Sequence, residues 1–130
     1  MDDILRSRFL ALYCMVLADG VIDIHELEAL YRIGSENYGL TNQQISEAVK
    51  EAGTSFSLPD KLEDKVSLLY QMAMICVADN DVDETEMNLL RRYSLKMGFD
   101  PENVDGIVEF LISEAKSNTP EKNIVAQIAG

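Results

Sequence analysis

Apolar residues spaced three and four positions apart recur along almost the whole chain, and this spacing is the strongest constraint on its fold. It places apolar side chains on one face of an α-helix. The clearest stripes are Leu5, Phe9, Leu12 and Val16, and then Val66, Leu69, Tyr70, Ala73 and Val77. Because no long alternation of apolar and polar residues indicates a strand, the sequence predicts an all-α fold.

Capping motifs indicate where the helices begin and end. A capping box pairs Asp or Thr with Glu or Gln three residues later, and its spacing occurs at Asp23–Glu26, Thr41–Gln44 and Asp83–Glu86. Prolines 59, 101 and 120 suit the first position of a helix, and glycines 20 and 39 suit helix ends. The predicted helices cover residues 3–18, 24–38, 42–52, 59–78, 84–97, 101–116 and 120–128, a bundle of about seven helices.

One helix is predicted to lie at the centre of the bundle. From Val66 to Ala78 only Ser67 and Gln71 are polar, and a helix that is apolar nearly all round has neighbours on several sides. The segment 53–57 links two halves, and neither half could bury its helices alone. We therefore expect a single domain over residues 1–130.

Charge and composition restrict the partners. The chain has 130 residues, 47% hydrophobic and 26% charged, as in globular domains. Its 23 acidic and 11 basic residues give a formal net charge of -12. This charge repels nucleic-acid phosphates and anionic membrane surfaces, and it favours cations.

The apolar runs and the cysteines indicate a cytoplasmic protein. Residues 9–18 and 68–78 are too short to insert across a bilayer, which needs about 20 residues. The chain begins with acidic residues, whereas a secretory signal begins with basic ones. Cys14 and Cys76 lie inside apolar runs, which predicts buried free thiols in a reducing compartment.

The two halves contain an internal repeat. Residues 18–27 (ADGVIDIHEL) align with residues 78–87 (ADNDVDETEM), with identical Ala, Asp, Asp and Glu. Further along, Leu30 aligns with Leu90, and Arg32 with Arg92. Each copy has an apolar helix, a short acidic turn and an amphipathic helix, which indicates duplication of one helix-turn-helix unit, in repeat halves of about 8–40 and 68–99.

The repeated pattern Ala-Asp-Gly-x-hydrophobic-Asp-x-x-Glu-hydrophobic resembles the TerB family, a helical domain associated with tellurite resistance. The resemblance extends from about residue 8 to residue 116. It implies a bacterial, cytoplasmic helical bundle of a stress-response system, with a metal ion bound by acidic residues. By position these are Asp19, Asp23, Glu26, Asp79, Asp83 and Glu86. Asn80 departs from the pattern because the first copy has glycine there, and this leaves open whether both turns hold one ligand.

Two interpretations of the acidic turns remain open. Helix capping alone explains carboxylates at the starts of helices. Asp19 and Asp79 lie at helix C-terminal ends, where the dipole disfavours an anion by roughly 0.3–1 kcal/mol. Either an Asx-type turn or a hard cation such as calcium or magnesium would offset this cost. A standard EF-hand is excluded, because Glu84 stands in place of its glycine and Leu90 in place of its bidentate glutamate.

We expect a non-enzymatic protein. Serine-nucleophile motifs, glycine-rich phosphate loops and Cys-x-x-Cys pairs are absent from the sequence. His25 has no partner at metal-ligand spacing and is expected at the surface. Arg91, Arg92 and Lys96 are expected to form a solvated face that pairs with local acids. The alternative to a cation-binding domain is a module for protein–protein interaction, in which the acidic turns only cap helices.

Overall fold

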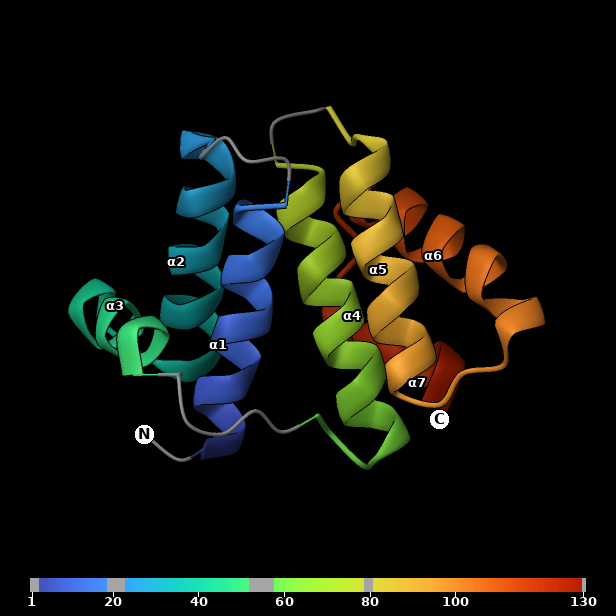
Figure 1. The fold of residues 1–130 in the computed structure, drawn as a ribbon, viewed down its shortest axis with the longest axis horizontal. Coiled ribbons are helices and arrows are strands. Elements are labelled where there is room, and N and C mark those ends of the chain that lie inside the picture. Colours follow the sequence, from blue (N-terminus) through green and yellow to red (C-terminus); the bar gives the residue numbers. More distant parts are fainter. Residues whose placement is uncertain (1–2, 19–22, 52–57, 79–80, 130) are drawn as a thin grey trace.

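The protein is a bundle of α-helices (Figure 1). The computed structural model describes residues 3–18, 23–51, 58–78 and 81–129. Within these ranges there is no strand, and the helices are α1 (Asp3–Val16), α2 (Ile24–Tyr38), α3 (Asn42–Glu51), α4 (Leu62–Cys76), α5 (Glu84–Lys96), α6 (Pro101–Lys116) and α7 (Glu121–Ala129). The predicted all-α class is confirmed.

Two antiparallel helix pairs form the body of the bundle. Helices α1 and α2 make one pair and α4 and α5 the other, so α2 and α5 both begin at the end of the bundle shown at the top of Figure 1. Helix α3 packs on α1 and α2, α6 packs on α4 and α5, and α7 packs on α4. This arrangement brings the starts of α2 and α5, which lie 60 positions apart in the sequence, to one end of the molecule.

Helix α4 is the centre of the core, as its composition predicts. It contacts α1, α2, α5, α6 and α7. Its buried side chains lie on all sides of the helix: Val66, Leu68, Leu69, Tyr70, Gln71, Met72, Ala73, Ile75 and Cys76. Because each of them loses its contact with water only when a neighbouring helix packs against it, α4 joins helices from both halves of the chain in one hydrophobic core.

The predicted boundaries agree with the structure to within two residues, except at the start of α4. The prediction that Pro59 begins this helix is wrong: Lys61 is the N-cap and the helix begins at Leu62. Proline fits an extended segment as well as a first helical turn, and Leu58 beside it packs against the core. The predicted helix end at Gly20 and the linker 53–57 lie outside the described residues.

Helices α2 and α5 end in the same way. Gly39 and Gly98 follow them with positive φ angles of 65° and 95°. The N–H of Leu40 donates to the carbonyl of Gly34 (3.0 Å), and the N–H of Phe99 donates to that of Ser94 (3.1 Å). Glycine adopts this left-handed conformation without a steric penalty, and the bonds satisfy carbonyls that the helix leaves unpaired.

Gly34 allows α2 and α3 to approach closely. A Cβ at this position would overlap Cδ1 of Ile45, and it would lie 3.0 Å from Cγ1 of the same residue. We expect Gly34→Ala to lower the free energy of unfolding by about 1–2 kcal/mol, because overpacking outweighs the better helix propensity of alanine. The matched control is Gly106→Ala in α6, where nothing lies within 4 Å of the added Cβ. It should stabilise the protein by about 0.5–1 kcal/mol. If urea unfolding showed that Gly34→Ala and Gly106→Ala stabilise the protein equally, the close approach of α2 and α3 at Gly34 would be contradicted.

Candidate acidic site

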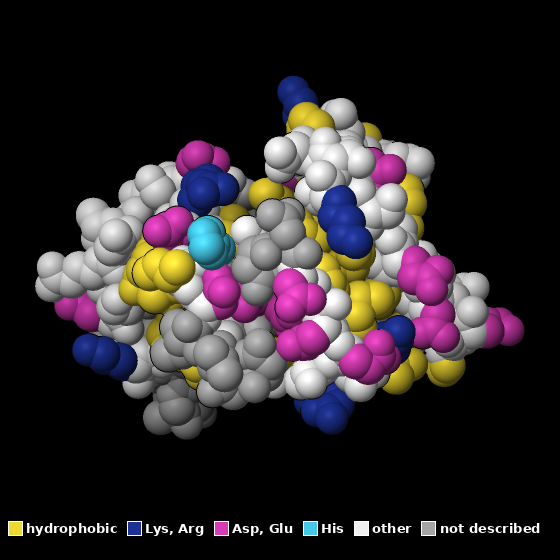
Figure 2. Space-filling view, turned by 90° about the horizontal axis from the view of Figure 1, so that it is seen from above, with side chains coloured by type: hydrophobic (Ala, Val, Ile, Leu, Met, Phe, Trp, Pro, Cys, Tyr) yellow, Lys and Arg dark blue, Asp and Glu magenta, His cyan; other side chains and the backbone are white. Residues whose placement is uncertain are grey.

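Four of the six predicted site residues lie at the starts of α2 and α5. Asp23 and Asp83 are the N-cap residues, and Glu26 and Glu86 lie in the first turns. Asp19 and Asp79 lie outside the described residues. Acidic side chains gather over this end of the bundle (Figure 2). The structure therefore brings the described residues of both repeat copies to one end, although they come from different halves of the sequence.

The start of α5 is a complete capping box. The N–H of Glu86 donates to Oδ1 of Asp83 (2.8 Å), and the N–H of Asp83 donates to Oε1 of Glu86 (3.2 Å). These two bonds satisfy backbone donors that have no partner within the helix. The same reciprocal pair forms between Thr41 and Gln44 at the start of α3, with distances of 2.9 and 3.1 Å. Two of the three predicted capping boxes, at Thr41–Gln44 and Asp83–Glu86, are therefore confirmed.

The start of α2 is capped by Asp23. Its Oδ1 accepts bonds from the N–H groups of His25 (2.8 Å) and Glu26 (3.3 Å). The same oxygen lies 3.3 Å from Nδ1 of His25, whose side chain is 63% exposed. His25 is therefore at the surface, as predicted. The capping role of Asp23 is also confirmed.

Glu26 and Glu86 are buried, which the sequence does not indicate. Their exposed fractions are 1% and 2%. Both carboxylates act on one thiol, that of Cys76 near the end of α4. Burial raises the pKa of Cys76 well above its usual value, and the negative charges of Glu86, Glu26 and Asp83 raise this pKa further. The first turns of α2 and α5 thus both contribute negative charge near the end of α4.

Two buried carboxylates at this end add to the negative charge of a protein that is already negative. A buried carboxylate costs several kcal/mol of solvation unless donors or cations compensate it. The first-turn N–H groups and the positive ends of α2 and α5 provide part of this compensation. Among the described residues, no group of three His, Cys, Asp or Glu side chains is placed to hold a metal ion. A cation at this end would therefore need ligands beyond the four described carboxylates.

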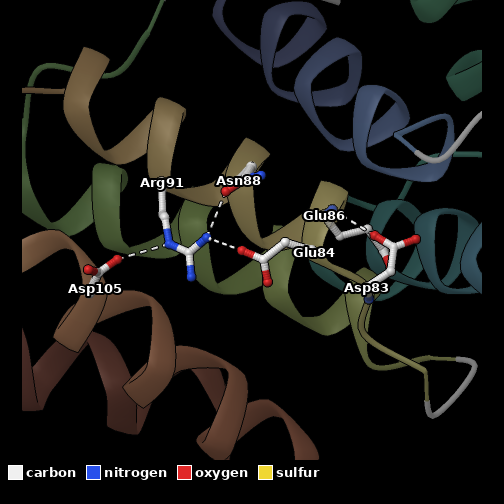
Figure 3. Close-up of polar contacts among 6 residues, drawn as sticks. All are labelled: Asp83, Glu84, Glu86, Asn88, Arg91 and Asp105. Atoms are coloured by element: carbon white, nitrogen blue, oxygen red, sulfur yellow. Dashed lines mark hydrogen bonds and ion pairs between the residues drawn. The ribbon is translucent and has the colours of Figure 1, made fainter.

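Glu84, an acid of the second copy that aligns with Ile24 in the first, points away from the capping box (Figure 3). Its Oε1 lies 2.9 Å from Nη1 of Arg91, and Oδ1 of Asp105 in α6 lies 2.9 Å from Nε of the same guanidinium. The bond to Glu84 is the main cause of a raised pKa of Arg91, and Asp105 adds to it. Arg91 thus pairs with local acids, as predicted.

The two cysteines are free thiols, as predicted. Cys76 is buried and Cys14 is half-buried. Nothing in the sequence places Cys76 beside two carboxylates, because Glu26 is 50 positions away. The only indication is that the apolar helix of each copy leads directly into an acidic turn.

None of the described helices is both long and apolar enough to cross a membrane. Comparison with known proteins returned no match: no family model, no curated protein and no solved structure is significantly similar to this chain.

Proposed function

We propose that this chain is a TerB-like, non-enzymatic domain of a bacterial stress response, and that it binds a divalent cation where α2 and α5 begin. Calcium and magnesium fit best, because hard cations prefer oxygen ligands. The proposed ligands come from the two acidic turns: Asp19, Asp23, Glu26, Asp79, Asp83 and Glu86. An interaction with a protein partner is compatible with this role.

The observation that carries the proposal is that α2 and α5 each bury a carboxylate in the first turn, at the same end of the bundle. Glu26 and Glu86 are each at most 2% exposed, and both raise the pKa of Cys76. Like charges repel more strongly in a buried region of low dielectric than they do in water. A divalent cation reached by both turns would remove this repulsion, whereas a cap needs only one carboxylate for each helix.

The proposed duplication is supported by the similarity of α2 and α5. Each begins with an Asp N-cap and buries a Glu three residues later. A glycine with positive φ follows each helix, directly after α2 and after the C-cap Met97 of α5. A repeated unit would place equivalent carboxylates around one approximate twofold axis, which suits one shared ion.

The alternative is an interaction module whose acidic turns only cap helices. The hydrogen bonds at Asp23 and Asp83 favour it, because capping is sufficient to explain these two residues. The exposed apolar side chain of Ile24, at the start of α2, would then belong to a contact with a partner. Cation titration separates the two functions.

Titration of the whole chain with calcium, magnesium, manganese and zinc tests the proposal. We expect a saturable heat of binding for at least one of the oxygen-preferring cations. We also expect the melting temperature to rise with its concentration, because a ligand that binds only the folded state stabilises that state. Absence of heat together with an unchanged melting temperature for all four cations would leave the turns as caps.

Amide variants separate binding from capping. Asparagine caps a helix about as well as aspartate, so Asp23→Asn and Asp83→Asn should unfold within about 0.5 kcal/mol of the parent when no cation is present. Each should weaken cation binding at least tenfold, about 1.4 kcal/mol, because a charged ligand is lost. Glu63→Gln is the matched control, since this exposed acid lies in the first turn of α4, at the opposite end of the bundle. Equal affinities in all three variants would exclude the proposed ligands.

A further inference from the structure

A second candidate site lies at the opposite end of the bundle from the acidic turns. A cavity of about 800 Å³ opens between α1, the end of α2, the segment before α4, and the start of α7. Pockets for small molecules usually measure about 300–1,000 Å³ and combine apolar walls with a few fixed polar groups. This cavity has both features.

The guanidinium of Arg8 is fixed in this cavity by neutral acceptors. Its Nη1 donates to Oγ of Ser67 (3.1 Å) and to Oε1 of Gln71 (3.0 Å), and its Nη2 donates to the carbonyl of Asp64 (3.3 Å). Its central carbon lies 5.9 Å from the centre of the Tyr38 ring, within the range of a cation–π contact. The side chain therefore has a defined orientation.

The positive charge of Arg8 has no ion-pair partner among the described residues. Arg91 shows the contrast, because two carboxylates lie 2.9 Å from its guanidinium. A guanidinium has five N–H donors, and the described residues take three of those on Arg8. In a chain with 23 acidic residues, an arginine held by neutral acceptors in a pocket is suited to an external anion.

The polar floor of the cavity, formed by Tyr38, Ser67 and Glu121, is held by bonds among these residues and to Gln71 behind them. Gln71 is fully buried. Its Nε2 donates to the hydroxyl of Tyr38 and to Oε1 of Glu121, each at 3.0 Å. Oε2 of Glu121 accepts a bond from the hydroxyl of Ser67 (2.8 Å). A floor whose bonds are already made does not need to rearrange when a ligand binds, which lowers the entropic cost of binding.

Apolar side chains line the remaining wall. Leu5, Leu58 and Leu68 border the cavity, together with Ile4, whose side chain is 66% exposed. Burying such a side chain against a ligand contributes about 0.8 kcal/mol for each CH₂ group removed from water. The wall thus favours a ligand that carries a hydrocarbon part next to its charge.

We propose that this cavity binds a small organic monocarboxylate with an apolar tail, its carboxylate on Arg8 and its tail against Ile4, Leu5 and Leu58. The ammonium group of Lys61 also borders the cavity, as do three carboxylates, those of Asp60, Asp64 and Glu121. Their repulsion rises with ligand charge, so a singly charged carboxylate is favoured over a phosphate dianion. This site is independent of the cation proposed at the other end.

Octanoate is the probe, and octanamide is its neutral counterpart of the same length. Titration of the ¹⁵N-labelled whole chain, followed by NMR, should show saturable shifts at the Gln71 side-chain amide and at the backbone amides of Arg8 and Ser67. Octanamide should bind at least about tenfold more weakly, because the charged hydrogen bond is lost. Equal binding of the two compounds, or no shifts with octanoate, would overturn the proposal.

Three variants locate the site. Arg8→Gln should weaken octanoate binding at least about tenfold, and Arg91→Gln, a surface arginine elsewhere, should leave it unchanged. Because Arg8 also joins α1 to α4, its loss could unfold the protein. Ile4→Ser avoids this problem, since its side chain is mostly exposed, and it should weaken binding about threefold or more through lost apolar contact. If octanoate bound the Ile4→Ser and parent proteins equally, the tail would not lie against this wall.

Discussion

Replacing Gln71 with leucine is expected to lower the free energy of unfolding by about 2–4 kcal/mol. Leucine is close to glutamine in volume, so the change removes hydrogen bonds and creates little empty space. The lost bonds leave Arg8, Tyr38 and Glu121, which are half-buried beside the cavity, each short of a partner on the side that faces the core. Two of these groups carry a charge, which makes their desolvation the largest part of the cost.

Equilibrium unfolding in urea measures this effect. The matched control is Gln43→Leu, because Gln43 is exposed on α3 and bonds only to Glu47 among the described residues. We expect it to change stability by less than about 0.5 kcal/mol. If Gln71→Leu were as mild as the control, the buried network would contribute nothing to holding α7 against α4.

The protein should lose stability steadily above about pH 9, where the unfolded chain begins to release thiol protons. Burial raises the pKa of Cys76 well above its usual value and raises that of Cys14. It also raises the pKa of Tyr93 to about 12, with the neighbouring Cys14 adding to the effect. The folded protein therefore retains protons that the unfolded chain has lost, and rising pH favours the unfolded state.

The contribution of Tyr93 sets the scale of this alkaline loss. A shift of one pKa unit corresponds to about 1.4 kcal/mol. Because the neighbouring Cys14 is only half-buried, solvent screens part of its interaction with Tyr93. We therefore expect Tyr93 to contribute about 1–2 kcal/mol between pH 10 and 12. Urea midpoints across this range measure it. Tyr93→Phe should flatten the decline, whereas Tyr31→Phe should retain it. A stability that is constant up to about pH 11 would contradict the burial of these groups.

Most of the fold could be predicted because its determinants are local. The spacing of apolar residues fixes the helices, and Asp23, Thr41 and Asp83 fix three of their starts through bonds to residues two or three positions away. Gly39 fixes an end in the same way. Pro59 misled the prediction because proline suits two conformations, and the choice between them depends on the packing of Leu58 against the core.

The sites could be predicted only in part, because they depend on contacts between distant residues. Gln71 is recognisable in the sequence as a polar residue in an apolar run, which requires a buried partner. Its partners lie 33 to 63 positions away, and no local pattern names them. Likewise the spacing of Glu26 and Glu86 predicts a role at helix starts, whereas their burial beside Cys76 follows only from the packing of α2 and α5 on α4.

Paramagnetic broadening by Mn²⁺ is the most direct test of a cation site at the starts of α2 and α5. Substoichiometric Mn²⁺ added to the ¹⁵N-labelled chain should first broaden the amides of His25, Glu26, Glu84 and Glu86, and excess Mg²⁺ should restore them. Broadening spread equally over exposed acids such as Glu109, or none at the starts of α2 and α5, would show that no cation binds there.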